Sequence, residues 1–311
     1  MMLLPFKGGA ALSAMGSLCS HLQTAAANFG LTEVMPKILS CGGNIIIHLA
    51  PHPIVARVAA FTPEQDPQIG KKLEQELHVA SHLHEEGVPV LLPVHFSQEG
   101  PFELDGHWMT FWEYIPQTAL PFPSPSEAVN IVNTLTLAME QYTGKLPILG
   151  VWDRIYQSVT RLSDHPDDRI QRLIHKFYEI DQQMRAESQL LVPSHGDAHA
   201  RNLMPSPRGW LWMDFEDVSL MPRYWDLASF VANLALFKGE QEPTFRFMIS
   251  RPDIVADRDA FGFALSARIL MSTLGNVDYA IAGHGDMEFA CSQLELAGEF
   301  IYRVEHICKG P

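Results

Sequence analysis

Cysteine is scarce in this chain, and long apolar runs are absent. The four cysteines form no Cys-x-x-Cys pair and lie far apart, which favours reduced thiols in a cytoplasm over a disulfide framework. No run of 18 or more apolar residues occurs, so neither a membrane-spanning helix nor a membrane partner is expected. The N-terminal stretch is not ordered like a signal peptide, because its only charge, Lys7, follows the first apolar residues. These absences predict a cytoplasmic protein.

Positive charge is also in short supply. Lys and Arg number 22 against 36 Asp and Glu, which gives a net charge of −14. A protein that binds nucleic acid needs a basic face, so this balance argues against a nucleic-acid partner. An acidic cleft would attract a cation, so the balance favours a small molecule that is cationic as the substrate.

Internal repeats and low-complexity tracts are absent, and the order of the expected elements gives the domain organisation. Apolar periodicity predicts a helix over 12–29, and β-branched runs predict a hairpin from the stretch IIIHLAPHPIVARVA. A second helix over 67–86 and an aromatic-rich strand over 107–115 follow. Four prolines then interrupt the chain, at Pro116, Pro121, Pro123 and Pro125.

The chain beyond these prolines is expected to be mainly helical. The periodic segments are 126–143, 151–162, 167–187, 224–238, 257–275 and 285–307, with a strand-and-loop insert at 190–217. We therefore predict an α+β fold of two lobes, a small β-rich N-lobe at 1–116 and a larger helical C-lobe at 117–311.

The tripeptide His-Gly-Asp occurs twice, and only its first copy has partners. After Asp197, an asparagine follows five residues later at Asn202, and a predicted hairpin then leads to Asp214. A carboxylate, an amide and a second carboxylate on adjoining loops suit a base that activates a hydroxyl beside a divalent cation, because Mg²⁺ prefers oxygen ligands. The second copy ends at Asp286 before an apolar-periodic helix, which predicts a helix N-cap there.

This spacing resembles the catalytic loop and metal-binding aspartate of protein kinases. The sequence HGDAHARN, with DFE in place of DFG, resembles more closely the motifs of the aminoglycoside phosphotransferase and choline kinase family. The resemblance implies a protein-kinase-like fold, Asp197 as the catalytic base, and Asn202 and Asp214 as Mg²⁺ ligands that bridge the phosphates of ATP. It also implies that His195 braces the loop and that Asp226, in PRYWDLASF, is structural.

The N-terminal half agrees with the same resemblance. The turn SCGGN, between the first helix and the first expected strand, resembles the glycine-containing turn over the phosphates, with Ser40, Gly42, Gly43 and Asn44 as candidates. Arg57 in PIVARV stands where the family has the basic residue that contacts the phosphates, and Glu76 stands where its glutamate partner lies. WEYIP resembles the adenine-binding hinge, which implies a role for Glu113, Tyr114 and Ile115.

The resemblance implies an ATP- and Mg-dependent kinase acting on a hydroxyl of a small molecule, such as an aminoglycoside-like antibiotic, an amino alcohol, a sugar or a nucleoside. Glu216 is either a second metal ligand or a solvated neighbour. Two other interpretations stay open. The fold could bind a nucleotide without catalysis, or His195, Asp197 and His199, at two-residue spacing, could bind zinc in a metallohydrolase.

Overall fold

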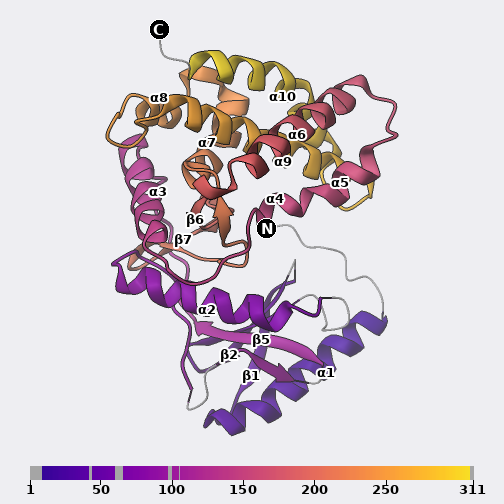
Figure 1. The fold of residues 1–311 in the computed structure, drawn as a ribbon. Coiled ribbons are helices and arrows are strands. Elements are labelled where there is room, and N and C mark those ends of the chain that lie inside the picture. Colours follow the sequence, from indigo (N-terminus) through magenta and orange to yellow (C-terminus); the bar gives the residue numbers. More distant parts are fainter. Residues whose placement is uncertain (1–8, 42–43, 60–65, 97–99, 105, 309–311) are drawn as a thin grey trace. The chain divides into compact units, whose positions relative to one another are not determined.

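A computed structural model describes the chain except for residues 1–8, 42–43, 60–65, 97–99, 105 and 309–311 (Figure 1). The chain forms two compact units. The first comprises Met1–Leu120 and Met204–Glu216, and the second comprises Pro121–Leu203 and Asp217–Pro311.

The first unit is built on a five-stranded antiparallel sheet with the strand order β1-β2-β3-β5-β4. The strands are β1 (Met35–Cys41), β2 (Asn44–Ala50), β3 (Ile54–Ala59), β4 (Phe102–Leu104) and β5 (His107–Glu113). The expected hairpin of β2 and β3 is confirmed. Strand β1 was not expected. It pairs with β2, so the sequence SCGGN begins within β1 and ends in β2 and does not follow a helix.

Two helices accompany this sheet, α1 (Gly9–Ala26) and α2 (Ile69–Glu85). Leu18 and Leu22 of α1 belong to the same apolar cluster as Ile47, Ala56 and Phe111 of the sheet. The α1 helix runs into a 3-10 turn that ends at Gly30, which takes a left-handed conformation, as a helix stop requires. Helix α2 buries one apolar stripe, and the stripe also carries the acidic Glu76.

A hairpin from the middle of the sequence completes the first unit. It consists of β7 (Leu203–Ser206) and β8 (Gly209–Trp212). Backbone bonds fix it to the chain before residue 120: Leu91 donates to the Trp212 carbonyl at 2.9 Å, and Thr118 donates to the Pro205 carbonyl at 3.2 Å. The predicted division at 116 and 117 therefore needs correction, because it placed this hairpin wholly with the helical lobe.

The second unit is mainly helical, as predicted. Its helices are α3 (Pro125–Glu140), α4 (Gly150–Asp153), α5 (Ile155–Leu162), α6 (Asp168–Ala186), α7 (Trp225–Lys238), α8 (Pro243–Ile249), α9 (Arg258–Ile281) and α10 (Met287–Ile307). Helix α3 begins after the proline-rich stretch with a capping box of Ser124 and Glu127. Asp286 caps α10 by accepting the Phe289 N–H at 3.0 Å, so the expected role of the second His-Gly-Asp copy is confirmed.

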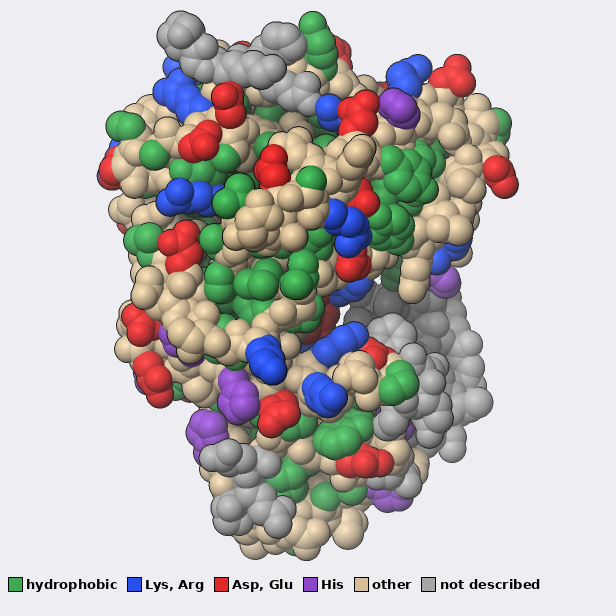
Figure 2. Space-filling model, in the orientation of Figure 1, with side chains coloured by type: hydrophobic (Ala, Val, Ile, Leu, Met, Phe, Trp, Pro, Cys, Tyr) green, Lys and Arg blue, Asp and Glu red, His purple; other side chains and the backbone are tan. Residues whose placement is uncertain are grey.

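Helix α9 is the central element of the second unit. It packs against α10, α7, α5 and α6, and by length and composition alone it could span a membrane. Its apolar window is 72% buried among these helices, as in the core helix of a globular protein. A short antiparallel pair, β6 (Val192–Ser194) and β9 (Ser219–Met221), brings the loop after Ser194 beside the segment that precedes Ser219. Acidic and basic side chains are interspersed over the visible face of the chain (Figure 2).

Candidate active site

The loop that carries Asp197 is held from beneath by a buried aspartate. Asp226, at the start of α7, is 1% exposed and accepts the backbone N–H groups of His195 at 2.8 Å and Gly196 at 3.0 Å. Trp225 donates its indole N–H to the Gly196 carbonyl at 2.7 Å. The structural role implied for Asp226 fits these bonds, since two charge-assisted hydrogen bonds fix the loop to the helix.

Only glycine fits at position 196. Its φ is +86°, in the left-handed region that side chains disfavour. A Cβ atom there would lie 2.1 Å from the carbonyl oxygen of Asp217, which is far inside van der Waals contact. The glycine of the His-Gly-Asp motif therefore allows the loop to approach Asp217, in the segment that precedes β9.

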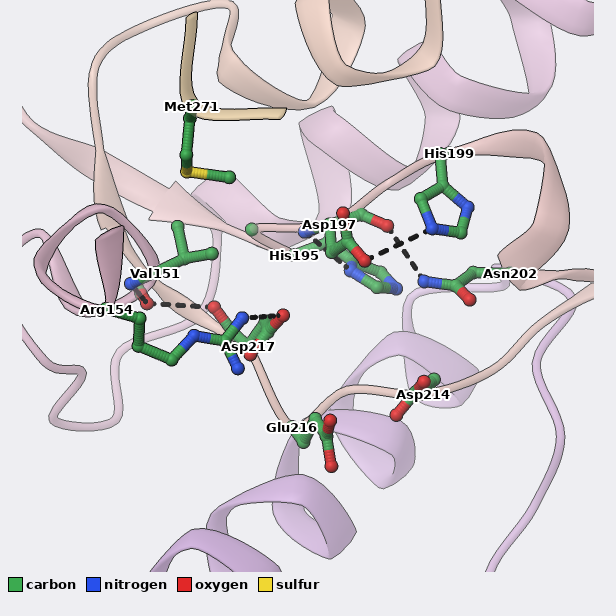
Figure 3. Close-up of polar contacts among 12 residues, drawn as sticks. Val151, Arg154, His195, Asp197, His199, Asn202, Asp214, Glu216, Asp217 and Met271 are labelled. Carbon is green, nitrogen blue, oxygen red and sulfur yellow. Dashed lines mark hydrogen bonds and ion pairs between the residues drawn. The ribbon is translucent and has the colours of Figure 1, made fainter. Parts of the chain in front are cut away.

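Asp197 projects from this loop into a strongly cationic setting. Its carboxylate forms an ion pair with Arg268 of α9. It also lies 3.2 Å from His199 Nε2 (Figure 3). Although burial by itself raises the pKa of Asp197, Arg268 and His199 outweigh it and hold that pKa well below its usual range. Asn202, which is buried, donates its side-chain N–H to the Asp197 carbonyl at 2.9 Å, so its amide oxygen is left for another partner.

The cavity beside Asp197 lies wholly within the second unit and has a volume of about 670 Å³. Such a volume suits a small-molecule substrate. Side chains of α5, α7, α9 and α10 line it together with the loop at 197–201.

The first unit holds a second cluster, centred on Arg57. This buried guanidinium forms an ion pair with Glu76 of α2 and lies 3.1 Å from Asp214 and 2.6 Å from Glu216. Burial by itself lowers the pKa of Arg57, but the three carboxylates more than reverse that effect. Burial raises the pKa of Glu76 to about 7, despite its pairing with Arg57, and the two other carboxylates add to the rise.

The exposed carboxylates of this cluster are candidate ligands for a divalent cation, although among the described residues no three His, Cys, Asp or Glu side chains are grouped to hold a metal ion by themselves. Three carboxylates surround one guanidinium, so negative charge is in excess. Asp214 and Glu216 are the exposed members, with side chains 41% and 42% exposed, and Asp214, two residues after the end of β8, has a φ of +69°. Hard oxygen donors that are accessible and only partly neutralised fit Mg²⁺.

The residues of the predicted phosphate turn are only partly described. Gly42 and Gly43 lie outside the described residues. Ser40 is exposed in β1. Asn44 begins β2 and donates its side-chain N–H to Glu216 at 3.1 Å, which connects the end of the turn with the carboxylate cluster.

In the predicted hinge, the Glu113 side chain and the Tyr114 backbone amide are already bonded to other residues of the first unit. Glu113 forms an ion pair with Arg208 of the β7–β8 hairpin and accepts the Leu92 N–H at 3.0 Å. Tyr114 donates its backbone N–H to the Pro53 carbonyl at 2.8 Å, and its ring stacks on His48 with centroids 3.8 Å apart. The Ile115 amide N–H forms no backbone hydrogen bond with another described residue.

The model of the phosphotransferase enzyme family matches residues 65–251, which is more than half of the sequence. This chain belongs to that family. No curated protein matches it.

Solved structures of small-molecule kinases share its fold. Amicoumacin kinase hAmiN, in complex with AMP-PNP, Ca²⁺ and Ami, has a TM-score of 0.66 at 12% identity, covering 95% of this chain and 96% of that one. The GDP and kanamycin complex of APH(2")-IIia has a TM-score of 0.65 at 14% identity, with coverages of 92% and 99%. Choline kinase LicA from Streptococcus pneumoniae has a TM-score of 0.63 at 13% identity, with coverages of 94% and 99%. The expected protein-kinase-like α+β fold is confirmed.

The interpretation as a zinc metallohydrolase finds no support in the geometry. Among the described residues, no three His, Cys, Asp or Glu side chains are grouped to hold a metal ion. His195 is fully buried, with its Nδ1 facing the Asp197 amide at 3.4 Å, and the Asp197 carboxylate already pairs with Arg268. A zinc ion would have to displace that guanidinium.

Sequence reasoning missed the basic residues that line the cavity of this phosphotransferase, among them Arg268 and Arg154. Arg268 contacts Asp197 from 71 residues further along the chain, and Arg154 pairs with Asp217 beside the cavity (Figure 3). Arg268 is one cation within the otherwise apolar stretch FALSARILM. A charge on the buried face of an apolar helix is a signal that could have singled it out.

Proposed function

We propose that this phosphotransferase transfers the γ-phosphate of ATP, with Mg²⁺, to a hydroxyl of a small molecule. The observation that carries the proposal is the position of Asp197, an ionised carboxylate fixed by Arg268 at the wall of a cavity of small-molecule size. Membership of the phosphotransferase enzyme family supports it.

Asp197 is the catalytic base in this proposal. The substrate hydroxyl donates to its carboxylate, which aims the oxygen at the γ-phosphorus. The new oxygen–phosphorus bond forms as the bond to the leaving ADP oxygen breaks, and the hydroxyl proton passes to Asp197. Because such transfers have a loose transition state, orientation matters more than base strength, so a carboxylate with a low pKa suffices.

Asn202 and Asp214 are the proposed metal ligands, and Glu216 is a further oxygen donor next to Asp214. When bound, Mg²⁺ supplies positive charge that offsets the charge of the phosphates. Arg57, kept in place by Glu76, binds phosphate oxygens in the proposal, and Ser40, Gly42, Gly43 and Asn44 belong to the turn that covers them. The backbone at Glu113–Ile115 binds adenine, with the Ile115 amide as the available donor.

A substrate is found first by measuring ADP formation from Mg·ATP over aminoglycosides, amino alcohols, sugars and nucleosides. With a substrate in hand, Asp197→Asn is expected to lower kcat by roughly 100- to 10,000-fold while the affinity for ATP stays nearly unchanged. Asp286→Asn is the matched control, since it alters the same tripeptide at a helix cap. Turnover of Asp197→Asn within a few-fold of wild type would refute the role of the base, and ATP binding with no turnover of any compound would contradict a catalytic function.

A further inference from the structure

The charges around the cavity in the second unit are opposite in sign to those of the whole chain. Four basic side chains line it, those of Arg154, Arg201, Lys238 and Arg268. Among the acidic residues that the structure describes, Asp197 alone lines it. The overall charge of −14 therefore lies elsewhere on the molecule.

From this setting we propose that the substrate carries an anionic group, a carboxylate or a phosphate, in addition to the hydroxyl that is phosphorylated. The inference rests on the proposed function and concerns the substrate of the same site. It reverses the expectation of a cationic substrate that the composition favoured.

Ion pairing inside the cavity leaves two cations in excess. Asp197 neutralises Arg268, and Asp217 neutralises Arg154. Arg201 and Lys238 are exposed, and neither forms an ion pair with another described residue. A cationic substrate would be repelled by these two charges. The acidic residue that lines the cavity, Asp197, is the proposed catalytic base and is already paired with Arg268. An anionic substrate gains attraction from both exposed cations.

Arg268 provides an independent observation that points to an anion. It is 6% exposed, and a buried guanidinium needs acceptors for its five N–H bonds. Asp197 satisfies one end, whereas Nη1 has only the Met271 sulfur at 4.0 Å and Nε has no partner among the described residues. An anionic group in the cavity would offer Arg268 a charged oxygen acceptor at Nη1, where it has only the Met271 sulfur.

Part of the remaining wall is apolar and suits an apolar portion of the same molecule. It includes Phe230, Leu234, Phe237 and Phe289, of which Phe237 and Phe289 contact each other with centroids 5.5 Å apart. Lys238 directly follows Phe237 at the end of α7, so a cation adjoins the apolar wall. The substrate that fits is thus a hydroxylated apolar or aromatic acid.

The test uses a series of hydroxylated aryl compounds that differ only in one terminal group, which is carboxylate, phosphate monoester, neutral amide or ammonium. ADP formation from Mg·ATP gives kcat and KM for each member with the wild-type chain, Lys238→Glu and Lys238→Gln. Arg246→Glu is the matched control, because Arg246 is exposed on α8 and does not line the cavity. Calorimetric titration of the carboxylate and ammonium members without nucleotide measures binding separately from turnover.

We expect the carboxylate or phosphate member to exceed the ammonium member by roughly tenfold or more in kcat/KM. Lys238→Glu should raise KM for that anion by roughly tenfold, Lys238→Gln by less, and Arg246→Glu should leave it unchanged. The ratio of the carboxylate to the phosphate member identifies the anion. A preference for the ammonium or amide member, or an equal effect of Lys238→Glu on all members, overturns the inference and leaves the proposed function intact. If no member of the series is turned over, the titrations decide the inference: tighter binding of the carboxylate member supports it, and tighter binding of the ammonium member overturns it. The proposed function itself is decided by the broader substrate screen.

Discussion

Asp226, which holds the loop that carries Asp197, gives the most sharply defined prediction. Asp226 accepts two backbone N–H groups, from His195 and Gly196, within a site that excludes water. Asp226→Ala removes both bonds and leaves two buried donors without acceptors. Each hydrogen bond to a charged group contributes about 1.5–3 kcal/mol, so the gross loss is about 3–6 kcal/mol.

Part of this loss in the free energy of unfolding is offset. Burial raises the pKa of Asp226, which shows that the folded protein bears a desolvation cost for this carboxylate. Alanine relieves that cost, so we expect a net loss near the lower limit, about 3 kcal/mol in the free energy of unfolding. We also expect kcat to fall roughly 100-fold, because a small displacement of Asp197 misaligns the hydroxyl.

Urea unfolding followed by circular dichroism measures the first effect, and steady-state kinetics measures the second. Asp286→Ala serves as the control, since an exposed N-cap contributes about 1 kcal/mol and lies outside the loop. If Asp226→Ala costs no more than Asp286→Ala, or if it destabilises the fold without lowering kcat, the loop does not depend on this anchor.

Three further perturbations test other contacts. Gly196→Ala should lower the free energy of unfolding by about 3 kcal/mol or more and abolish turnover, because the added Cβ would lie 2.1 Å from the Asp217 carbonyl oxygen. Thermal melting and kcat measure the two effects, and a fully active variant would refute the prediction. Burial alone would raise the pKa of Asp181, but hydrogen bonds led by the one from Tyr156 lower it, so the ionised Asp181 stabilises the fold above about pH 4 and this stabilisation is lost as the pH falls through the lower folded pKa. The variant Asp181→Asn should therefore show a smaller loss of its urea unfolding midpoint at acid pH than the wild-type chain. An unchanged dependence of the midpoint on pH would contradict this. Asp214→Ala should weaken Mg·ATP binding at least roughly tenfold in calorimetry, and unchanged affinity would count against the metal site.

Much of the fold could be predicted from the sequence, because the signals for helices, breaks and motifs lie within short stretches of the chain. Apolar periodicity and proline-rich breaks located the larger helices, and the Asn202 and Asp214 spacing separated one His-Gly-Asp copy from the other. Elements without such signals were missed. Strand β1 is mostly exposed and has no clear alternation, and β9 has three residues. The β7–β8 hairpin was assigned to the helical lobe, because its partners, such as Leu91, lie more than 100 residues earlier.

The residues of the candidate site divide in the same way. The sequence by itself determined the loop with Asp197, its asparagine and the helix cap at Asp286, because each depends on neighbours within a few residues. Only the tertiary structure decided what surrounds them. Arg268 reaches Asp197, and Lys238 and Arg201 line the cavity, although the composition is acidic. Net charge sums over the whole surface, whereas a substrate responds to the few charges close to it, and long-range packing alone selects those.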